Sequence, residues 1–355
     1  MDFQKYFTSD AIAEYWTNDV TNAQAFGSDA LFPPRKKAGL ELKWIRGHKG
    51  VGVSLMPSAF DTKATFRERK GFKMSETEMP FFREGFHIDE KDRQMLMEIQ
   101  NSNSTFAEEI ISRIFDDAAE LITGARIVPE RMAWQLLCPE NGKPGITIKA
   151  NGVNYIYDYD PDGTWQAKNY KALTGKAKWD VTTSTPLTDF ATAKDAIAAS
   201  VGETITHAYM NTNTLNKMIA SDEVKNRFMT VTAKSIAVLT QSEARALVEQ
   251  TTDIKIHLFD KMYQPEGGGD SVKYIPDGYV VLVPDGKVGE MWYGTTPEEA
   301  DLRAGLTNAS VSIVNNGVAV TTIKEPHPVN TNIIASEIVL PSFQKMDAVY
   351  CIKAY

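Results

Sequence analysis

The chain has 355 residues, 43% hydrophobic and 24% charged, which is enough for two globular domains with extensions. Its net charge of −8 argues against a protein that wraps nucleic acid through phosphate contacts. No stretch approaches the ~20 apolar residues of a membrane span, and the N-terminus lacks the basic and apolar order of a secretory signal. We therefore expect a soluble, intracellular protein in which Cys138 and Cys351 are buried thiols rather than a disulfide.

Residues 1–39 predict an N-terminal arm that docks on other parts of the structure. Thr8-Ser9-Asp10 offers caps for a short helix with Ile12, Tyr15 and Trp16 on one side. The basic run Arg35-Lys36-Lys37 follows two prolines, and we expect it to be solvated rather than to bind nucleic acid.

Residues 40–88 predict an extended β-hairpin loop. Apolar residues mark an outgoing arm and a returning arm, glycines and prolines interrupt both, and no helical period is present. Arms of about 15 to 20 residues would reach about 50 to 65 Å. Because an isolated two-stranded ribbon is marginal in water and its edges can pair with another chain, we interpret this loop as an assembly arm.

The loop also supplies the candidate site residues, which we expect to contact neighbouring subunits. They combine a mixed-charge tip, residues 61–70, with polar and aromatic positions on the two arms. The predicted contact residues are Trp44, Arg46, Asp61, Lys63, Phe66, Arg67, Glu68, Arg69, Lys70, Glu76 and Glu78.

After the loop, apolar residues at helical spacing predict a long helix from about Ser104 to Thr123. Gly124 is expected to interrupt it, and Pro129 suits the first turn of a second helical piece. Alternating residues from Gly145 to Tyr159, around an Asn151-Gly152 turn, predict a hairpin.

Residues 187–320 alternate between helical and extended patterns and predict an inserted α/β domain. Helices are expected at residues 190–200, 213–219, 222–229 and 241–250, and strands at 205–210, 254–262, 279–283 and 291–293. The stretches 337–340 and 348–352 read as C-terminal strands that return to the sheet beside the long helix.

Three motifs could carry chemistry, and none is convincing. Asp158 to Gly163 imitates the opening of a calcium loop, but Asn169 stands where a bidentate Glu is needed, so an acidic turn is the better interpretation. His87 and Asp89 would share one face of a strand without a second histidine nearby. Gly267-Gly268-Gly269 lacks the lysine of a phosphate-binding loop. We predict no enzyme, no metal and no cofactor.

The order of these elements resembles the Hong Kong 97 fold, and the sequence is similar to the phage lambda-type major capsid protein E family. The resemblance spans essentially the whole chain. It is carried by Phe32-Pro33 leading into Gly39-Leu40-Glu41-Leu42, Leu55-Met56-Pro57-Ser58-Ala59-Phe60-Asp61, residues 76–85 (ETEMPFFREG), and Ile275-Pro276-Asp277-Gly278.

The resemblance implies an α+β Hong Kong 97-type capsid fold in four parts. Residues 1–39 would be the N-terminal arm, 40–88 the extended loop, 89–186 with 321–355 the peripheral domain with its long spine helix, and 187–320 the axial domain. The function implied is a major capsid protein that self-assembles through hexamers and pentamers into the icosahedral head shell around phage double-stranded DNA.

The resemblance also implies the partners and the location. Expected partners are other copies of the chain, a separate scaffolding protein and a portal, with DNA enclosed without sequence-specific binding and no membrane. Whether a decoration protein joins them is left open by the sequence. The protein would be found in the virion, from a phage or prophage, after assembly in the host bacterial cytoplasm. Two alternatives stay open here. One is an encapsulin-like nanocompartment with the same fold, and the other is a metal-assisted enzyme around His87 and Asp89.

Overall fold

The computed structural model describes residues 8–18, 27–46, 73–88, 90–91, 94, 106–150, 152–232, 239–265, 269–306, 309–327 and 329–355. The chain forms two compact units. Unit 1 comprises Met1–Leu42, Glu76–Met132 and Glu290–Ser342, and unit 2 comprises Lys43–Ser75, Ala133–Gly289 and Phe343–Tyr355. The division into an N-terminal arm, an extended loop, a peripheral domain and an axial domain stays a prediction.

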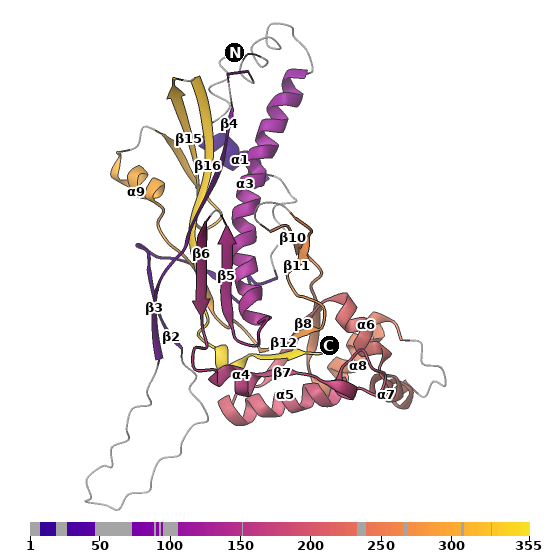
Figure 1. Ribbon diagram of the computed structural model, residues 1–355. Helices are drawn as coiled ribbons and strands as arrows, with labels where there is room; N and C mark the ends of the chain where they lie inside the picture. The colour runs from indigo at the N-terminus through magenta and orange to yellow at the C-terminus, as the bar shows by residue number, and fades with distance from the viewer. Residues whose placement is uncertain are drawn as a thin grey trace, which may run out of the picture. The chain divides into compact units, whose positions relative to one another are not determined.

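Unit 1 is built on a sheet in the order β1-β13-β16-β15-β14, with β4 also paired to β16. Figure 1 shows β4 and β15 beside β16. The central strand β16 is also the longest, with 14 residues. The strands are β1 (Pro34–Lys36), β4 (Phe81–Ile88), β13 (Glu290–Tyr293), β14 (Ser310–Val314), β15 (Val318–Pro326) and β16 (Val329–Ser342).

One face of this sheet is covered by α1 (Ser9–Asn18) and the long helix α3 (Phe106–Leu137). The buried side chains of α3 lie at the predicted helical spacing, at Ile114, Ala118 and Ile122. They pack with Ile12 and Trp16 of α1 and with sheet residues Val314, Val318, Val320, Ile333 and Ala335. The predicted N-terminal helix and the apolar stripe of the long helix are therefore confirmed where the structure describes them.

The predicted break at Gly124 was wrong, because α3 continues through Gly124 and Pro129 as one helix of 32 residues. Proline removes one backbone hydrogen bond of a helix. Here the loss is offset by the burial of Met132, Leu136 and Leu137, each 0% exposed, on the turns that follow. Tertiary packing thus overrides the local signal.

The returning arm of the predicted loop divides into two strands. β3 (Lys73–Glu78) forms a two-stranded sheet with β2 (Glu41–Arg46), as a ribbon should. The next strand, β4, instead pairs antiparallel with β16, from Phe81 opposite Ile338 to Ile88 opposite Thr331. Gly85 permits this close approach, because a Cβ there would lie 2.7 Å from the Ile333 carbonyl oxygen.

Unit 2 is built on a five-stranded sheet in the order β7-β17-β12-β8-β9. All six residues of the central strand β12 are buried. The strands are β7 (Tyr170–Ala172), β8 (Ile205–Met210), β9 (Lys255–Leu258), β12 (Tyr279–Pro284) and β17 (Tyr350–Lys353). Its larger helices are α5 (Pro186–Val201), α6 (Thr212–Ala220), α7 (Asp222–Thr232) and α8 (Gln241–Thr252).

Most helices and strands predicted for residues 187–320 are confirmed, and they join sheets in both units. β13, α9 (Pro297–Ala304), β14 and β15 belong to unit 1. The C-terminal strand β17 pairs instead with β12 and β7. The predicted hairpin is confirmed as β5 (Gly145–Ala150) and β6 (Val153–Asp158), with Gly152 at φ +77° in the turn.

The remaining elements of the described chain are short. They are α4 (Thr164–Asn169), the 3₁₀ helices η3 (Gly175–Ala177) and η4 (Met346–Ala348), and the paired strands β10 (Met262–Tyr263) and β11 (Val272–Lys273). Cys138 and Cys351 are free and buried, as predicted, and burial raises the pKa of both thiols. Across the described ranges, none of the helices is long and apolar enough to cross a membrane.

Candidate functional site

Arg46, the last residue of β2, lies at the base of the predicted loop and is held by two carboxylates. Its Nη2 lies 2.6 Å from Oδ1 of Asp347, and its Nη1 lies 3.6 Å from Oδ1 of Asp160. The Arg46 side chain is only 11% exposed and that of Asp160 is fully buried. Charge pairs held this far from water are broken only at a substantial free-energy cost, so the position of Arg46 at the end of β2 is fixed.

Asp160 is itself held by the first turn of α4. Its carboxylate accepts hydrogen bonds from the backbone N–H groups of Trp165, at 3.0 Å, and Gln166, at 2.9 Å. Burial alone would raise the pKa of Asp160, but these two hydrogen bonds and the nearby Arg46 guanidinium lower it below the ordinary value. The acidic turn from Asp158 to Gly163 thus anchors a helix and the loop base.

The structure offers no support for metal chemistry in the parts that it describes. Among those residues there is no group of three or more His, Cys, Asp or Glu side chains placed to hold a metal ion. His87 is exposed on β4, and Asp89 lies outside the described residues. Gly267 and Gly268 also lie outside them.

Most of the predicted contact residues lie beyond what the structure describes. Asp61, Lys63, Phe66, Arg67, Glu68, Arg69 and Lys70 fall outside the described residues. Trp44 and Glu76 belong to β2 and β3, and their side chains are not described. Glu78 is exposed at the end of β3, and Arg46 pairs within its own chain. The predicted inter-subunit contact of these residues therefore stays a prediction.

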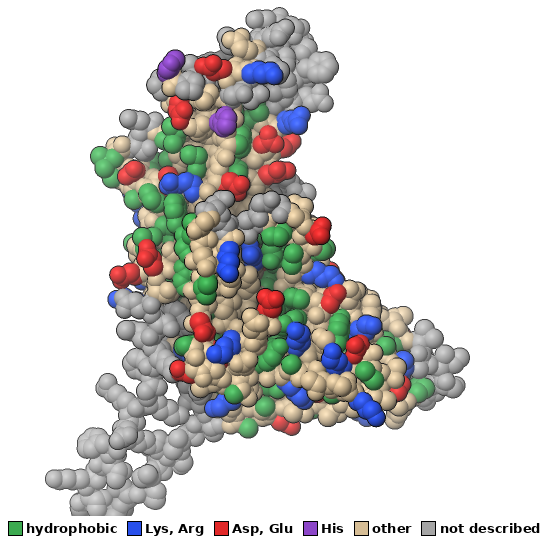
Figure 2. Space-filling view, in the orientation of Figure 1, with side chains coloured by type: hydrophobic (Ala, Val, Ile, Leu, Met, Phe, Trp, Pro, Cys, Tyr) green, Lys and Arg blue, Asp and Glu red, His purple; other side chains and the backbone are tan. Residues whose placement is uncertain are grey.

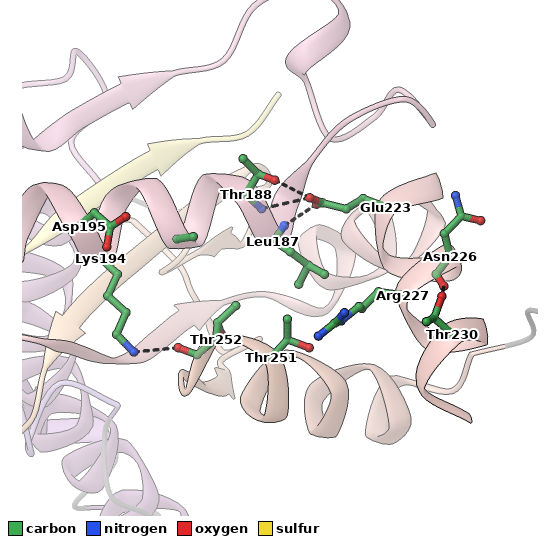
Figure 3. Close-up of a pocket in the computed structure, with 11 residues that line it drawn as sticks. Leu187, Thr188, Lys194, Asp195, Glu223, Asn226, Arg227, Thr230, Thr251 and Thr252 are labelled. Atoms are coloured by element: carbon green, nitrogen blue, oxygen red, sulfur yellow. Dashed lines mark hydrogen bonds between the residues drawn. The ribbon is translucent and has the colours of Figure 1, made fainter. Parts of the chain in front are cut away.

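An open groove of about 630 Å³ lies between α5, α7 and the end of α8, and sequence reasoning missed it (Figure 3). Glu223 of α7 accepts hydrogen bonds from the backbone N–H groups of Leu187 and Thr188 at the start of α5. Lys194 donates to the Thr252 carbonyl oxygen at 2.9 Å. These hydrogen bonds hold together the helices that form the walls of the groove. The helical periodicity of the sequence could not predict how these helices pack.

Two histidines that are isolated in the sequence meet in unit 2. His207 Nδ1 lies 3.0 Å from His257 Nε2, and Tyr209 stacks on the His257 ring. Burial lowers the pKa of His257, and the neighbouring His207 lowers it further. The parallel pairing of β8 and β9 creates this contact, and such long-range pairing leaves no local sequence signal.

The charges on the described surface are mixed. Figure 2 shows Lys and Arg side chains interspersed with Asp and Glu over the face in view. The basic run is paired within the chain, because Lys36 Nζ lies 2.6 Å from Glu299 and Arg35 Nε lies 3.4 Å from Glu290. This distribution suits contacts between protein subunits better than a groove for phosphates.

A comparison with known protein families identifies the family of this chain. The model of the family described as phage major capsid protein E matches residues 8–354. The chain belongs to this family. This capsid protein is a structural protein of the virion, where copies of the chain form the icosahedral head shell. An encapsulin-like compartment is not favoured by this match.

Solved structures are similar to this capsid protein over nearly its whole length. One is a phage-related protein from Bordetella bronchiseptica RB50, 14% identical, with 98% of this chain and 97% of that chain covered and a TM-score of 0.55. Another is a putative prophage capsid protein from E. coli CFT073, 12% identical, with 98% and 99% covered and a TM-score of 0.59. The predicted α+β Hong Kong 97-type fold is confirmed. A comparison with curated proteins finds no match.

Proposed function

We propose that this capsid protein assembles through hexamers and pentamers, and that its extended loop reaches across to neighbouring subunits. The observation that supports this most is the fixed base of the loop, where Arg46 is held by Asp160 and Asp347. A loop that leaves from a fixed base loses less conformational entropy when it docks on a partner.

The tip of the loop, residues 61–70, is the part proposed to make the contact. It carries Lys63, Arg67, Arg69 and Lys70 together with Asp61 and Glu68, and Phe66 stands between the charges. An aromatic side chain surrounded by charged groups is a composition suited to a protein interface with a polar rim. In this proposal residues 1–39 act as the arm, 89–186 with 321–355 as the peripheral domain, and 187–320 as the axial domain.

The shell is proposed to enclose double-stranded DNA without sequence-specific binding. The net charge of −8 supports confinement rather than neutralisation of each phosphate. A scaffolding protein, a portal and a decoration protein are proposed as partners, and the host bacterial cytoplasm as the place of assembly. Membership of a phage capsid family supports this proposal.

Deletion of residues 58–71 tests the role of the loop. The truncated protein should fold, because the described cores of both units are formed by other residues. It should fail to form closed shells when it is co-expressed with its scaffold and viewed by electron microscopy. Normal shells from the truncated protein would contradict the proposal, as would loss of the folded subunit in circular dichroism.

A charge variant separates specific contacts from net charge. Arg67→Glu, Arg69→Glu and Lys70→Glu, made together, should reduce shell yield at least tenfold. The matched control combines Lys149→Glu, Lys168→Glu and Lys176→Glu, three exposed positions outside the loop, and should assemble better. Nuclease-protected DNA inside wild-type particles is expected, and a protein cargo in its place would favour a nanocompartment.

A further inference from the structure

Glu337 is a buried acid in unit 1 that the assembly function does not explain. It lies near the middle of β16 and is 1% exposed. Neither of its carboxyl oxygens has a hydrogen-bond partner among the residues described. Buried polar groups are normally satisfied, and one that is not destabilises the folded state unless it serves another purpose.

The side chain points to the face of the sheet that α3 covers. Side chains alternate along a strand, so Glu337 shares a face with Ile333 and Ala335. Both of those residues pack in the cluster formed with α1 and α3. Glu337 therefore occupies a position where an apolar residue would be expected between β16 and the long helix.

The charged and titratable groups around Glu337 do not neutralise it. Tyr293 of β13 is close enough that the carboxyl helps to raise the Tyr293 pKa, after burial itself. The same tyrosine also senses Asp29, Glu130 and Arg126. Glu130 is bonded to Ser28, and the Arg126 guanidinium lies over the Trp16 ring, 5.4 Å from its centroid.

The paired strand β4 adds a further acid and no base to this face. Phe82 lies opposite Glu337 in the register, and Glu84, two residues further along β4, is exposed. Burial raises the pKa of Glu337 well above its ordinary value of 4.5. Burial therefore favours the neutral form of the carboxyl inside the packed unit.

We propose that Glu337 is a proton-linked latch between β16 and α3. In the packed arrangement the Glu337 carboxyl keeps its proton. A rearrangement that exposes β16 to water releases this proton, and the resulting carboxylate opposes repacking because burial of a charge is unfavourable. Only the biological role of the latch rests on the proposed shell function. That role would be to oppose the return of the shell to its earlier state once it has rearranged. It is tested on unassembled subunits, so its failure and a failure of assembly are separate results.

The sign of the pH dependence follows from the raised pKa. Below pH 4.5 the carboxyl is protonated in both the packed and the open forms, so it contributes no penalty. As the pH rises toward the pKa of the packed form, the open form loses its proton first. Each pH unit within this window favours opening about tenfold.

Hydrogen exchange followed by mass spectrometry tests the latch on the unassembled full-length protein. Peptides covering β16 should lose protection as the pH rises from 5 to 8, after correction for the intrinsic exchange rate. Glu337→Gln should abolish this slope and slow the exchange of β16 at pH 8. The matched control Glu84→Gln, which alters an exposed acid on the neighbouring strand, should keep the wild-type slope.

Two results would overturn the latch. One is a pH slope in β16 that persists in Glu337→Gln, or in Glu337→Leu if the glutamine variant does not fold. The other is a failure of both variants to fold, because a residue that opposes packing cannot be required for it. The assembly of Glu337→Gln is scored separately by electron microscopy.

Discussion

The sheets of the two units differ in how they treat polar groups. In unit 2 all six residues of β12 are buried, and the buried Thr214 hydroxyl is bonded to Asn211 and to the Gly278 N–H. In unit 1 the sheet contains Thr321, Thr322 and Glu337, whose buried oxygens have no hydrogen-bond partner within the described part of the chain. The unit 2 sheet also has one such oxygen, Thr206 Oγ1 of β8. The difference is therefore that the unit 1 sheet buries a carboxyl group and two neighbouring threonine hydroxyls without described partners, which lowers its stability.

The largest expected effect comes from emptying the core of unit 2. Phe190 is 0% exposed and meets Trp179 edge to face, with ring centroids 5.6 Å apart. Phe190→Ala should lower the free energy of unfolding by about 3–5 kcal/mol in urea titrations. Ile156→Ala, at a position 60% exposed, serves as the control and should change it by less than about 0.5 kcal/mol. Equal effects would remove the contrast between core and surface.

The next effect comes from the base of the loop. Arg46→Ala leaves Asp160 buried without its cation and should destabilise unit 2 by about 3 kcal/mol at pH 7. Because the pKa of Asp160 is lowered, its contribution is present above pH 3.8 and is lost as the pH falls further. The variant should therefore lose less stability than wild type in an acid titration. Parallel acid curves would refute this assignment.

A matched pair of threonines tests the comparison directly. Thr321→Val removes a buried hydroxyl without a described partner and should stabilise the protein by about 1 kcal/mol. Thr214→Val removes a bonded hydroxyl and should destabilise it by about 1–3 kcal/mol, because the Gly278 N–H loses its acceptor. The two substitutions are chemically identical, so thermal unfolding that moves in the same direction for both would break the contrast.

The smallest effect concerns the histidine pair. The pKa of His257 is lowered by burial and by His207, so the folded state resists its protonation. Its stabilising contribution is complete above pH 6.5 and is lost as the pH falls below that value, by at most one proton per chain. His257→Gln should flatten this slope in hydrogen exchange of the β8 and β9 peptides. An unchanged slope would mean that another group titrates there.

Local patterns predicted the elements well where each element is decided by its own residues. Ile205–Met210 and the helices around Phe190 and Leu215 were found because apolar spacing matches their burial. The partnering of strands was not predictable. β13 and β17 are short apolar runs that fit either sheet, and only tertiary packing assigns β13 to unit 1 and β17 to unit 2.

The candidate site could be predicted only as a stretch of chain. The glycines and the mixed charges of residues 40–88 predict an extended loop, but no local pattern reveals that Arg46 is paired with Asp160 and Asp347, more than a hundred residues away. For the same reason, the contact between His207 and His257 and the burial of Glu337 could not be predicted from local patterns. In Glu337's case a lone acid directly before the apolar run of residues 338–340 was the available signal.

The pairing of β4 with β16 has a mechanical consequence. Met79 and Pro80 are the only residues between β3 at the base of the loop and β4. The bonds between antiparallel strands run perpendicular to the strands. A force along β4 would thus act in shear on all eight residue pairs between β4 and β16 together, rather than separate them one at a time. A neighbouring subunit bound to the loop would therefore apply this force to the middle of the sheet. Glu337 lies opposite Phe82, the second residue of β4 along the direction of the force.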